Sequence, residues 1–332
     1  MNASTTNSSQ RLSEKATSIK LEIPKGWPTP PTDIFASNPP TEEGFQLGRK
    51  LFYDGRLSKD GNFACASCHQ QFAAFATYDH DLSHGFHDQF TMRNAPPLFN
   101  LAWKKLYHWD GGINHIEVQA LSPLTAPNEM AENLDSVLDK LRADPVYKKM
   151  FQAAFGSSRI NSQRMLKALS QFVGIMVSAN SKYDKVMRGE DEFNSAEKHG
   201  YELYKVSCAS CHTEPLFTSL EFKNNGLPLN SYLNDYGRMR ITGETGDSLK
   251  FMVPTLRNLS VTFPYMHDGR LYSLYNVVDH YRKNIVVSNT LDSTLLKPVE
   301  LSDDDKNDLV YFLHSLTDTS FLKDKRFSQP AF

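Results

Sequence analysis

The pentapeptide Cys65-Ala-Ser-Cys68-His69 occurs twice in this chain, and its second copy is Cys208-Ala-Ser-Cys211-His212. The two copies hold all four cysteines. A Cys-x-x-Cys-His run is typical of covalent c-type haem attachment, in which two thiols bond to the porphyrin vinyl groups and the adjacent histidine gives iron its proximal nitrogen. The sequence therefore predicts two covalent haems, each held by the two cysteines of its motif, with the motif's histidine on the iron.

Three other uses of paired cysteines fit the sequence less well. A redox dithiol needs only Cys-x-x-Cys, and neither copy lies in an evident strand-to-helix unit. A four-cysteine zinc site spaces its two pairs by about 15–20 residues, far less than the separation of Cys65 from Cys208. Disulfides would not explain a histidine directly after both pairs. The motifs indicate a protein that handles electrons.

Length and composition indicate a globular protein of about two domains. The chain has 332 residues and a formal net charge of −2, and ~150 residues is a typical domain size. This charge gives no reason to expect nucleic acid or an anionic membrane surface as a partner. No apolar run approaches the ~18 residues of a membrane-spanning helix. Two well-separated haem motifs fit one haem per domain.

The first twenty residues differ from the rest of the chain. Residues 1–20 are rich in Ser, Thr and Asn and nearly free of apolar side chains, which predicts a disordered leader. A secretory signal needs an apolar core segment, and this sequence does not show one. Covalent haem attachment nevertheless takes place outside the cytoplasm in bacteria. We therefore expect a periplasmic or otherwise extracytoplasmic protein in a processed or recombinant form.

The apolar periodicity predicts a mainly α-helical fold with long loops. Thr41, followed by two glutamates, is a typical helix start, and so are Asn194-Ser195 and Ser302. Residues 132–155 and 160–180 carry apolar side chains at helical spacing. Strand-like alternation is scarce, so little sheet is expected.

A weak internal repeat accompanies the two haem motifs. Gly48-x-x-Leu51-Phe52 precedes the first motif and Gly200-x-x-Leu203-Tyr204 precedes the second. Glycine at this place permits a close helix crossing. With a break near residues 180–190, we expect two cytochrome c-like domains, residues 21–180 and 181–332, each with one haem. The C-terminal tail is expected to pack back on the first domain.

Several polar side chains after the first motif are candidate residues of the distal pocket, on the side of the iron opposite the proximal histidine. A strong sixth ligand makes a haem an electron carrier, whereas an open or labile position permits chemistry. His80, His84 and His87 lie in a polar loop, where solvated histidines are equally expected. Gln119 and Glu129 follow, and a surface carboxylate is the default interpretation of Glu129. The residues alone leave these roles open.

Further motifs resemble, in order, those of the bacterial di-haem cytochrome c peroxidases. The resemblance runs from about residue 25 to residue 318 and covers a superfamily that includes the tryptophan-modifying maturation enzyme MauG. The motifs are Leu47-Gly48-Arg49-Lys50-Leu51-Phe52-Tyr53-Asp54, Arg93-Asn94-Ala95-Pro96, Trp109-Asp110-Gly111, Glu117-x-Gln119, Asn128-Glu129-Met130, Val253-Pro254-x-Leu256-Arg257-Asn258 and Pro264-Tyr265-Met266-His267-Asp268-Gly269. Such a set is highly specific for the superfamily.

The resemblance implies a division of labour between the two haems. The haem on His69 corresponds to the low-potential peroxidatic centre, and the haem on His212 to the centre that receives electrons. Trp109 corresponds to the aromatic residue between them. Glu129 matches the distal carboxylate and Gln119 its distal amide partner.

The distal carboxylate has a physical rationale. Cleavage of a peroxide needs a base that takes a proton from the bound oxygen and delivers it to the departing one, which Glu129 can do and Gln119 cannot. His87 lies six residues before Arg93, where the peroxidases carry a distal histidine, and His84 is its rival.

The resemblance also implies a calcium ion between the domains. Asn94, Thr262 and Pro264 fall where the family binds this ion, mostly through carbonyl oxygens. Calcium is a hard cation and binds oxygen ligands. We expect two c-type haems and one calcium ion as cofactors.

The second half departs from the peroxidase pattern at one position. Fourteen residues after His267, typical peroxidases carry a methionine on the electron-transfer iron, whereas this chain has Tyr281. The MauG branch carries a tyrosine there. A phenolate is a hard anionic donor that favours ferric iron, whereas a thioether raises the potential. We expect Tyr281 on the second iron; alternatively, Tyr281 packs on the haem and Met266 or Met252 is the ligand.

Three functions are compatible with these residues. The first is reduction of hydrogen peroxide to water with electrons from a small periplasmic cytochrome c or cupredoxin. The second is a MauG-like oxidation of a protein or another large substrate. The third is a non-catalytic electron carrier, which makes no use of Gln119 and Glu129. Glu129 favours the peroxidase and Tyr281 the oxidase. We expect the peroxidase, as a monomer or a homodimer.

Overall fold

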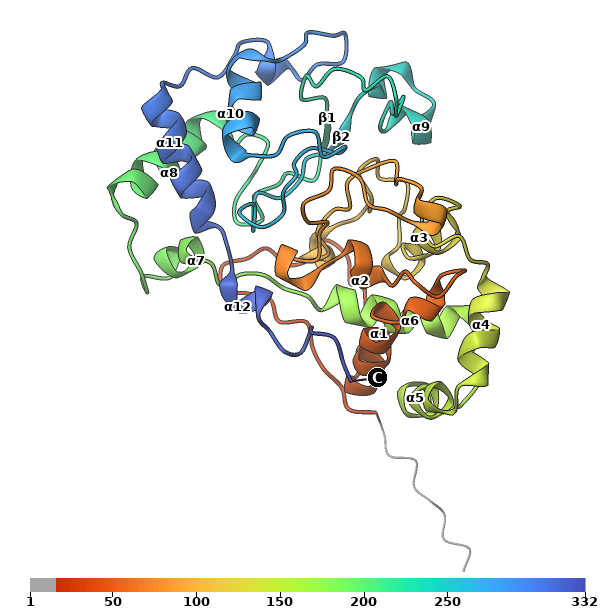
Figure 1. Ribbon diagram of the computed structural model, residues 1–332. Coiled ribbons are helices and arrows are strands. Elements are labelled where there is room, and N and C mark those ends of the chain that lie inside the picture. Colours follow the sequence, from red (N-terminus) through yellow and green to blue (C-terminus); the bar gives the residue numbers. More distant parts are fainter. Residues whose placement is uncertain (1–15, 332) are drawn as a thin grey trace, which may run out of the picture.

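The computed structural model describes residues 16–331, and its regular structure is almost entirely helical (Figure 1). The α-helices are α1 (Glu42–Phe52), α2 (Cys65–Cys68), α3 (Leu121–Thr125), α4 (Leu134–Ala143), α5 (Pro145–Phe155), α6 (Ser162–Gly174), α7 (Lys182–Met187), α8 (Ser195–Ser207), α9 (Met239–Thr242), α10 (Leu274–Lys283), α11 (Asp303–Ser315) and α12 (Thr319–Leu322). Two short strands, β1 (Phe222–Lys223) and β2 (Phe251–Met252), pair antiparallel. The prediction of a mainly α-helical chain is confirmed.

The helices begin where the sequence predicts because local side chains cap them. The hydroxyl of Thr41 accepts a hydrogen bond from the Gly44 N–H at the start of α1. Asn194 and Ser302 form capping boxes at α8 and α11. The predicted helix over 132–155 is instead two, α4 and α5, because Asp144 caps a new helix whose first residue is Pro145.

Residues 180–190 and the end of the predicted leader have more regular structure than the sequence predicts. The predicted break near residues 180–190 contains the short helix α7, which Ser181 caps. Most of the predicted leader, residues 1–15, lies outside the described residues. The part that is described, residues 16–20, pairs with the chain before and at α1: the Glu42 N–H donates to the Thr17 carbonyl at 2.8 Å.

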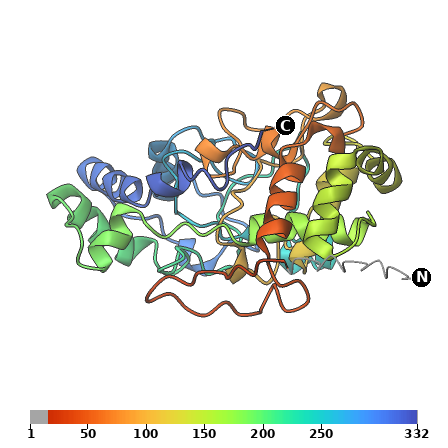
Figure 2. The ribbon, with the colours of Figure 1, turned by 90° about the horizontal axis from the view of Figure 1, so that it is seen from below.

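Two apolar clusters organise the chain. The first contains α1, α4, α5 and α6, and the second is built on α8, α10 and α11. Figure 1 shows these helices gathered at opposite ends, with long loops and the β1–β2 pair between them, and Figure 2 shows the same division from below. The C-terminal tail returns to the first cluster, where Phe321 and Phe327 are buried and the Tyr53 hydroxyl donates to the Phe327 carbonyl at 2.7 Å.

Each cluster contains one close crossing of two helices, and both crossings depend on glycine. α1 packs on α6, and α8 packs on α11. A Cβ atom at Gly48 would lie 2.0 Å from the carbonyl oxygen of Ala168, and one at Gly200 would lie 2.0 Å from that of Asp308. The glycines of the weak sequence repeat therefore occupy equivalent places in the two halves.

Alanine at either crossing glycine should destabilise the protein. A methyl group at Gly48 or Gly200 must push a backbone carbonyl away, so we expect each substitution to lower the free energy of unfolding by about 1–3 kcal/mol, as overpacking usually does. Denaturant unfolding of the haem-loaded protein measures this loss. Gly246→Ala is the matched control, because an added Cβ there meets nothing within 4 Å. Equal midpoints for Gly48→Ala and the control would contradict the prediction.

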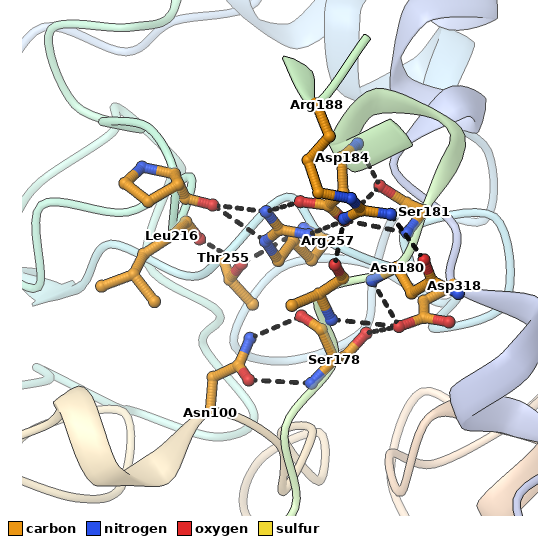
Figure 3. Close-up of polar contacts among 12 residues, drawn as sticks. Asn100, Ser178, Asn180, Ser181, Asp184, Arg188, Leu216, Thr255, Arg257 and Asp318 are labelled. Carbon is orange, nitrogen blue, oxygen red and sulfur yellow. Dashed lines mark hydrogen bonds and ion pairs between the residues drawn. The ribbon is translucent and has the colours of Figure 1, made fainter. Parts of the chain in front are cut away.

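A buried polar network joins the segment between the two clusters to the second half (Figure 3). Arg257, which is 0% exposed, makes two hydrogen bonds of 2.8 Å to the carboxylate of Asp184. Its guanidinium also donates to the Pro215 carbonyl at 2.7 Å, close after the second haem motif. Nearby, the Ser178 hydroxyl donates to Asp318, just before α12. The network fixes the loop that carries His212.

Two candidate haem sites

A cavity of about 450 Å³, here called the first chamber, lies beside the first haem motif. Its volume is in the ~300–1,000 Å³ range of cofactor and ligand pockets. Apolar side chains of α1 and α6 form part of its wall, and polar side chains from the intervening loops complete it. The predicted site residues among its lining are Cys65, Cys68, His69, His84, Asn94, Trp109, Gln119 and Glu129. Residues far apart in the sequence thus meet around one space.

The first motif has the chemistry that a covalent haem requires. α2 places Cys65 and Cys68 three residues apart, so that they share a face of the helical turn, and neither is in a disulfide. His69 Nδ1 lies 2.8 Å from the Phe75 carbonyl oxygen, which leaves Nε2 for a metal. Burial lowers the pKa of His69 to about 4, so the imidazole is neutral at pH 7. These residues fit the haem that the motif predicts.

Glu129 and Gln119 both line the first chamber. Burial raises the pKa of Glu129, so this carboxyl can be protonated closer to neutral pH than an ordinary glutamate. Its backbone is held against the histidine loop: the Phe86 N–H donates to the Glu129 carbonyl at 2.7 Å, and a Cβ at Gly85 would lie 2.6 Å from the Glu129 Cα. Glycine at position 85 therefore permits this approach.

The three loop histidines take different positions. His84 lines the first chamber, and its Nδ1 lies 2.6 Å from an Asp88 carboxylate oxygen. His87 is not among the lining residues; its ring stacks on Phe86 with 3.9 Å between the centroids. His80 packs against His84 with 5.6 Å between the ring centroids. Of the three loop histidines, His84 is the one that lines the first chamber, whereas the sequence favoured His87.

Trp109 lies between the first chamber and the loops that follow the second motif. It lines the first chamber and also a smaller cavity of about 50 Å³, whose wall includes Leu216 and Pro254. Its indole N–H donates to the Asn94 carbonyl at 2.8 Å, and its own carbonyl accepts from the Met252 N–H at 2.7 Å. Trp109 is therefore fixed from both halves of the chain.

Arg93 is a polar link between the halves that sequence reasoning did not assign. Its guanidinium bonds Asp110 and Asp235, each at 2.6 Å, and the side chain of Asp235 is 1% exposed. The Arg93-Asn94 motif pointed to this region, but its partner Asp235 lies 142 residues away. Such a pairing leaves no periodic signal in the sequence.

The second motif repeats the arrangement of the first. Neither Cys208 nor Cys211 is in a disulfide, and His212 Nδ1 lies 3.0 Å from the Pro254 carbonyl oxygen. Burial lowers the pKa of His212 to about 4, so its imidazole is neutral and its Nε2 is left for a metal. These residues also fit a covalent haem.

Tyr281 lies on α10 beside the second motif. Burial raises its pKa to about 12, and the hydrogen bond from Asn225 acts in the opposite direction. Asn225 Nδ2 lies 3.5 Å from the Tyr281 hydroxyl and 3.5 Å from the Met266 sulfur. Tyr281 and its rival Met266 therefore approach the same point, whereas Met252 lines the small cavity beside Trp109.

Asn94, one of the residues matched to the calcium site, contacts the second half of the chain. The Asn94 N–H donates to the His267 carbonyl at 2.9 Å, which brings Asn94 to the segment that follows Pro264. Asn94 Nδ2 donates to the Asp81 carbonyl at 3.1 Å, which leaves Oδ1 as a donor to a cation. Asn94 and Thr262 are both buried.

Comparison with known proteins shows which family the chain resembles. The sequence model of the di-haem cytochrome c peroxidase family matches residues 42–192. The chain is 37% identical over 286 residues to the methylamine utilization protein MauG of Methylorubrum extorquens, covering 84% of this chain and 80% of that protein. It is 33% identical over 288 residues to the cytochrome c551 peroxidase of Nitrosomonas europaea, covering 86% and 83%.

Solved structures extend the comparison to the whole fold. The crystal structure of a MauG-like protein associated with microbial copper homeostasis superposes with a TM-score of 0.83 at 33% identity, covering 94% of this chain and 99% of the other. The di-haem peroxidase BthA of Burkholderia thailandensis shares the fold with a TM-score of 0.77 at 22% identity, over 90% and 93% of the two chains. On the motifs, the identity and the coverage, this chain belongs to the di-haem cytochrome c peroxidase and MauG family.

Proposed function

We propose that this chain is a di-haem peroxidase that reduces hydrogen peroxide to water with electrons from a small redox protein, a cytochrome c or a cupredoxin. The proposal divides the chain into residues 21–180, which carry the peroxidatic haem, and residues 181–332, which carry the haem that receives electrons. The observation that supports it best is that Glu129 and Gln119 line the same chamber as His69.

The proposed reaction consumes one peroxide, two electrons and two protons and releases two waters. A haem iron bound by His69 would supply the redox chemistry that breaks the O–O bond. Glu129 accepts the peroxide proton at a carboxylate oxygen and returns it to the departing oxygen. Gln119 donates an amide N–H that orients the peroxide. The apolar wall of the chamber keeps bulk water from competing for these groups.

The proposed electron route passes Trp109. This indole lines both the first chamber and the small cavity beside Pro254, whose carbonyl orients His212. Electrons from the donor protein reach the second site first and arrive one at a time. Two deliveries are needed for each peroxide.

Steady-state assays test the proposed function. We expect saturable, peroxide-dependent oxidation of a reduced cytochrome c or cupredoxin, with two donor molecules oxidised for each peroxide. Spectra taken alongside should show peroxide binding at one haem only. A protein that binds peroxide at neither haem would contradict the proposal and favour the electron carrier.

A second candidate function is the oxidation of a protein substrate. Tyr281, at the position where the MauG branch carries a tyrosine, favours it, and so does the 37% identity to a MauG. Here the two electrons come from an aromatic side chain of the substrate protein, whose mass then changes. Slow oxidation of every small donor, together with a mass change in a co-incubated protein, would support this candidate.

Tyr281 is proposed to bind the second iron, and its replacement tests this role. Tyr281→Met should raise the potential of the second haem, because a thioether stabilises ferrous iron better than a phenolate does. Tyr281→Phe should change the spectrum and admit cyanide to this iron. Tyr275→Phe is the control, since Tyr275 lies on the same helix and is 42% exposed. If Tyr281→Phe leaves the spectrum as the control does, Met266 becomes the proposed ligand.

The remaining proposals concern the calcium ion and the compartment. Asn94, Thr262 and Pro264 would hold calcium, and a chelator should then lower the turnover and the stability of the junction. In the described part of the chain, none of the helices combines the length and apolar character needed to cross a bilayer. We propose a periplasmic location because covalent haem attachment takes place outside the bacterial cytoplasm.

A further inference from the structure

Asn225 lies at a turn that faces α10, and its side chain touches both residues that compete for the second iron. Its amide nitrogen is 3.5 Å from the hydroxyl of Tyr281 and 3.5 Å from the sulfur of Met266. These two side chains come from different segments, one from α10 and one from the loop before it. Asn225 is therefore the group that both candidate ligands share.

The orientation of the Asn225 amide follows from its other contact. Its Oδ1 accepts a hydrogen bond from the Leu227 N–H at 3.4 Å. Because the carbonyl oxygen is used in this way, the NH₂ group is the end that faces Tyr281 and Met266. The side chain thus presents a donor to the two ligands.

The backbone of Asn225 is held by the same helix that carries Tyr281. His280 Nε2 lies 2.9 Å from the Asn225 carbonyl oxygen, and because a carbonyl oxygen only accepts, the ring nitrogen donates this bond. The chain after α10 fixes both neighbours: Asn224 Nδ2 donates to the Ser288 hydroxyl, and the Val286 N–H donates to the Gly226 carbonyl. The turn is therefore a rigid support for the amide.

We propose that Asn225 is a positioning residue that selects Tyr281 over Met266 as the ligand of the second iron. A neutral N–H donor bonds strongly to an anionic phenolate, because such hydrogen bonds are charge-assisted. A thioether sulfur is only a weak acceptor, so it gains little from the same amide. The amide thus stabilises ligation of the second iron by Tyr281 and gives little stabilisation to ligation by Met266.

The Met266 sulfur lies as close to the Asn225 amide as the Tyr281 hydroxyl does, and the backbone of Met266 is fixed. It has a φ of +77°, in the left-handed region that non-glycine residues seldom adopt. On both sides of it, Tyr265 and Leu271 form an antiparallel bridge. The proposal therefore predicts ligand exchange, with no large rearrangement, when the Asn225 donor is lost.

The test removes the donor and then the competitor. Asn225→Leu is close in size to asparagine but cannot donate. We expect the phenolate-to-ferric-iron absorption of the second haem to fall at least tenfold in the variant. Its midpoint potential should rise because the thioether takes the place of the phenolate. A tenfold change in this one-electron equilibrium corresponds to about 59 mV. Adding Met266→Leu should restore the absorption, since Tyr281 is then the remaining ligand.

Two matched variants separate a selective role from a structural one. Asn225→Gln keeps an N–H donor and should retain most of the absorption, and Asn284→Leu, at the exposed end of α10, should match the unmodified protein. The proposal is overturned if Asn225→Leu behaves like Asn284→Leu, or if Met266→Leu does not restore the absorption.

The inference rests on the proposed ligation by Tyr281, and the experiment distinguishes the two failures. If Tyr281→Phe leaves the absorption and potential unchanged, the proposed ligand is wrong and Asn225 has nothing to select. If Tyr281→Phe abolishes the absorption while Asn225→Leu retains it, the ligand is right and the selective role of Asn225 is wrong. Peroxide turnover of the unmodified protein tests the proposed reaction separately.

Discussion

Replacing Glu129 with glutamine should lower peroxide turnover by about 10²–10⁴-fold, the usual contribution of general acid–base catalysis. Glutamine keeps the size and hydrogen-bonding capacity of the side chain but cannot carry a proton between the two oxygens. Both haems should stay bound, because Glu129 lies outside both Cys-x-x-Cys-His motifs. Stopped-flow spectra with excess peroxide measure the loss directly.

A control and a pH profile make this test specific. Glu221→Gln removes a carboxylate whose side chain is 64% exposed, and it should leave turnover unchanged. Below its pKa, Glu129 is protonated and cannot accept the peroxide proton, so turnover falls as the pH is lowered. Because burial raises this pKa, the fall should begin above the ~4.3 of an ordinary glutamate. A Glu129→Gln variant with nearly normal turnover would assign the proton transfer to another residue.

Replacing Arg257 with methionine should cost about 3–5 kcal/mol of unfolding free energy, as breaking a buried ion pair usually does. Arg257 is 0% exposed and Asp184 is 5% exposed, so the variant leaves an uncompensated carboxylate in the interior. The loop carrying Pro215 also loses its hydrogen bond to the guanidinium. The denaturation midpoint of the haem-loaded protein should therefore fall sharply.

Two further variants identify the cause of this loss. Arg257→Met with Asp184→Leu replaces both charges and should recover much of the stability. Lys205→Met breaks an exposed pair with Glu202 and should cost at most about 1 kcal/mol. An Arg257→Met variant as stable as Lys205→Met would show that the buried pair contributes little.

The buried pair also predicts a dependence of stability on pH. Burial alone would raise the pKa of Asp184, but the hydrogen bonds and charge of Arg257 outweigh it and lower the pKa. A carboxylate whose pKa is lower in the folded than in the unfolded protein stabilises the fold at any pH above its pKa in the unfolded chain. This stabilisation is lost as the pH falls through the pKa that the carboxylate has in the folded protein. The unmodified protein should lose more stability in acid than the variant that lacks both charges.

What could be predicted from the sequence was local. Three helix starts could be predicted, those at Thr41, Asn194 and Ser302. At each, the side chain of the capping residue accepts a hydrogen bond from the backbone N–H three residues later. The two crossing glycines could be predicted because the same short pattern precedes both haem motifs. The proposed haem attachment residues follow from a contiguous motif. Each of these features needs only neighbouring residues.

What could not be predicted depends on loops that meet over long distances. Asn225 contacts Tyr281 across 56 residues, and Arg93 contacts Asp235 across 142. Neither contact has a periodic pattern, because at least one partner of each lies in an irregular loop. The positions of His84 and His87 in the sequence also do not show which of the two side chains lines the first chamber. That depends on the contact of His84 with Asp88 and on the stacking of His87 on Phe86.

The return of the C-terminal tail has a consequence for how the protein is made. Phe321 and Phe327 belong to the core built around α1 and α6, and Gln71 donates to the Asp324 carbonyl across 253 residues. This core cannot close until the chain has been synthesised as far as Phe327. Contacts so distant in sequence also form slowly. If haem attaches to Cys65 and Cys68 as proposed, the delay leaves their thiols accessible to it, and the packing of Phe321 and Phe327 on this core ends that interval.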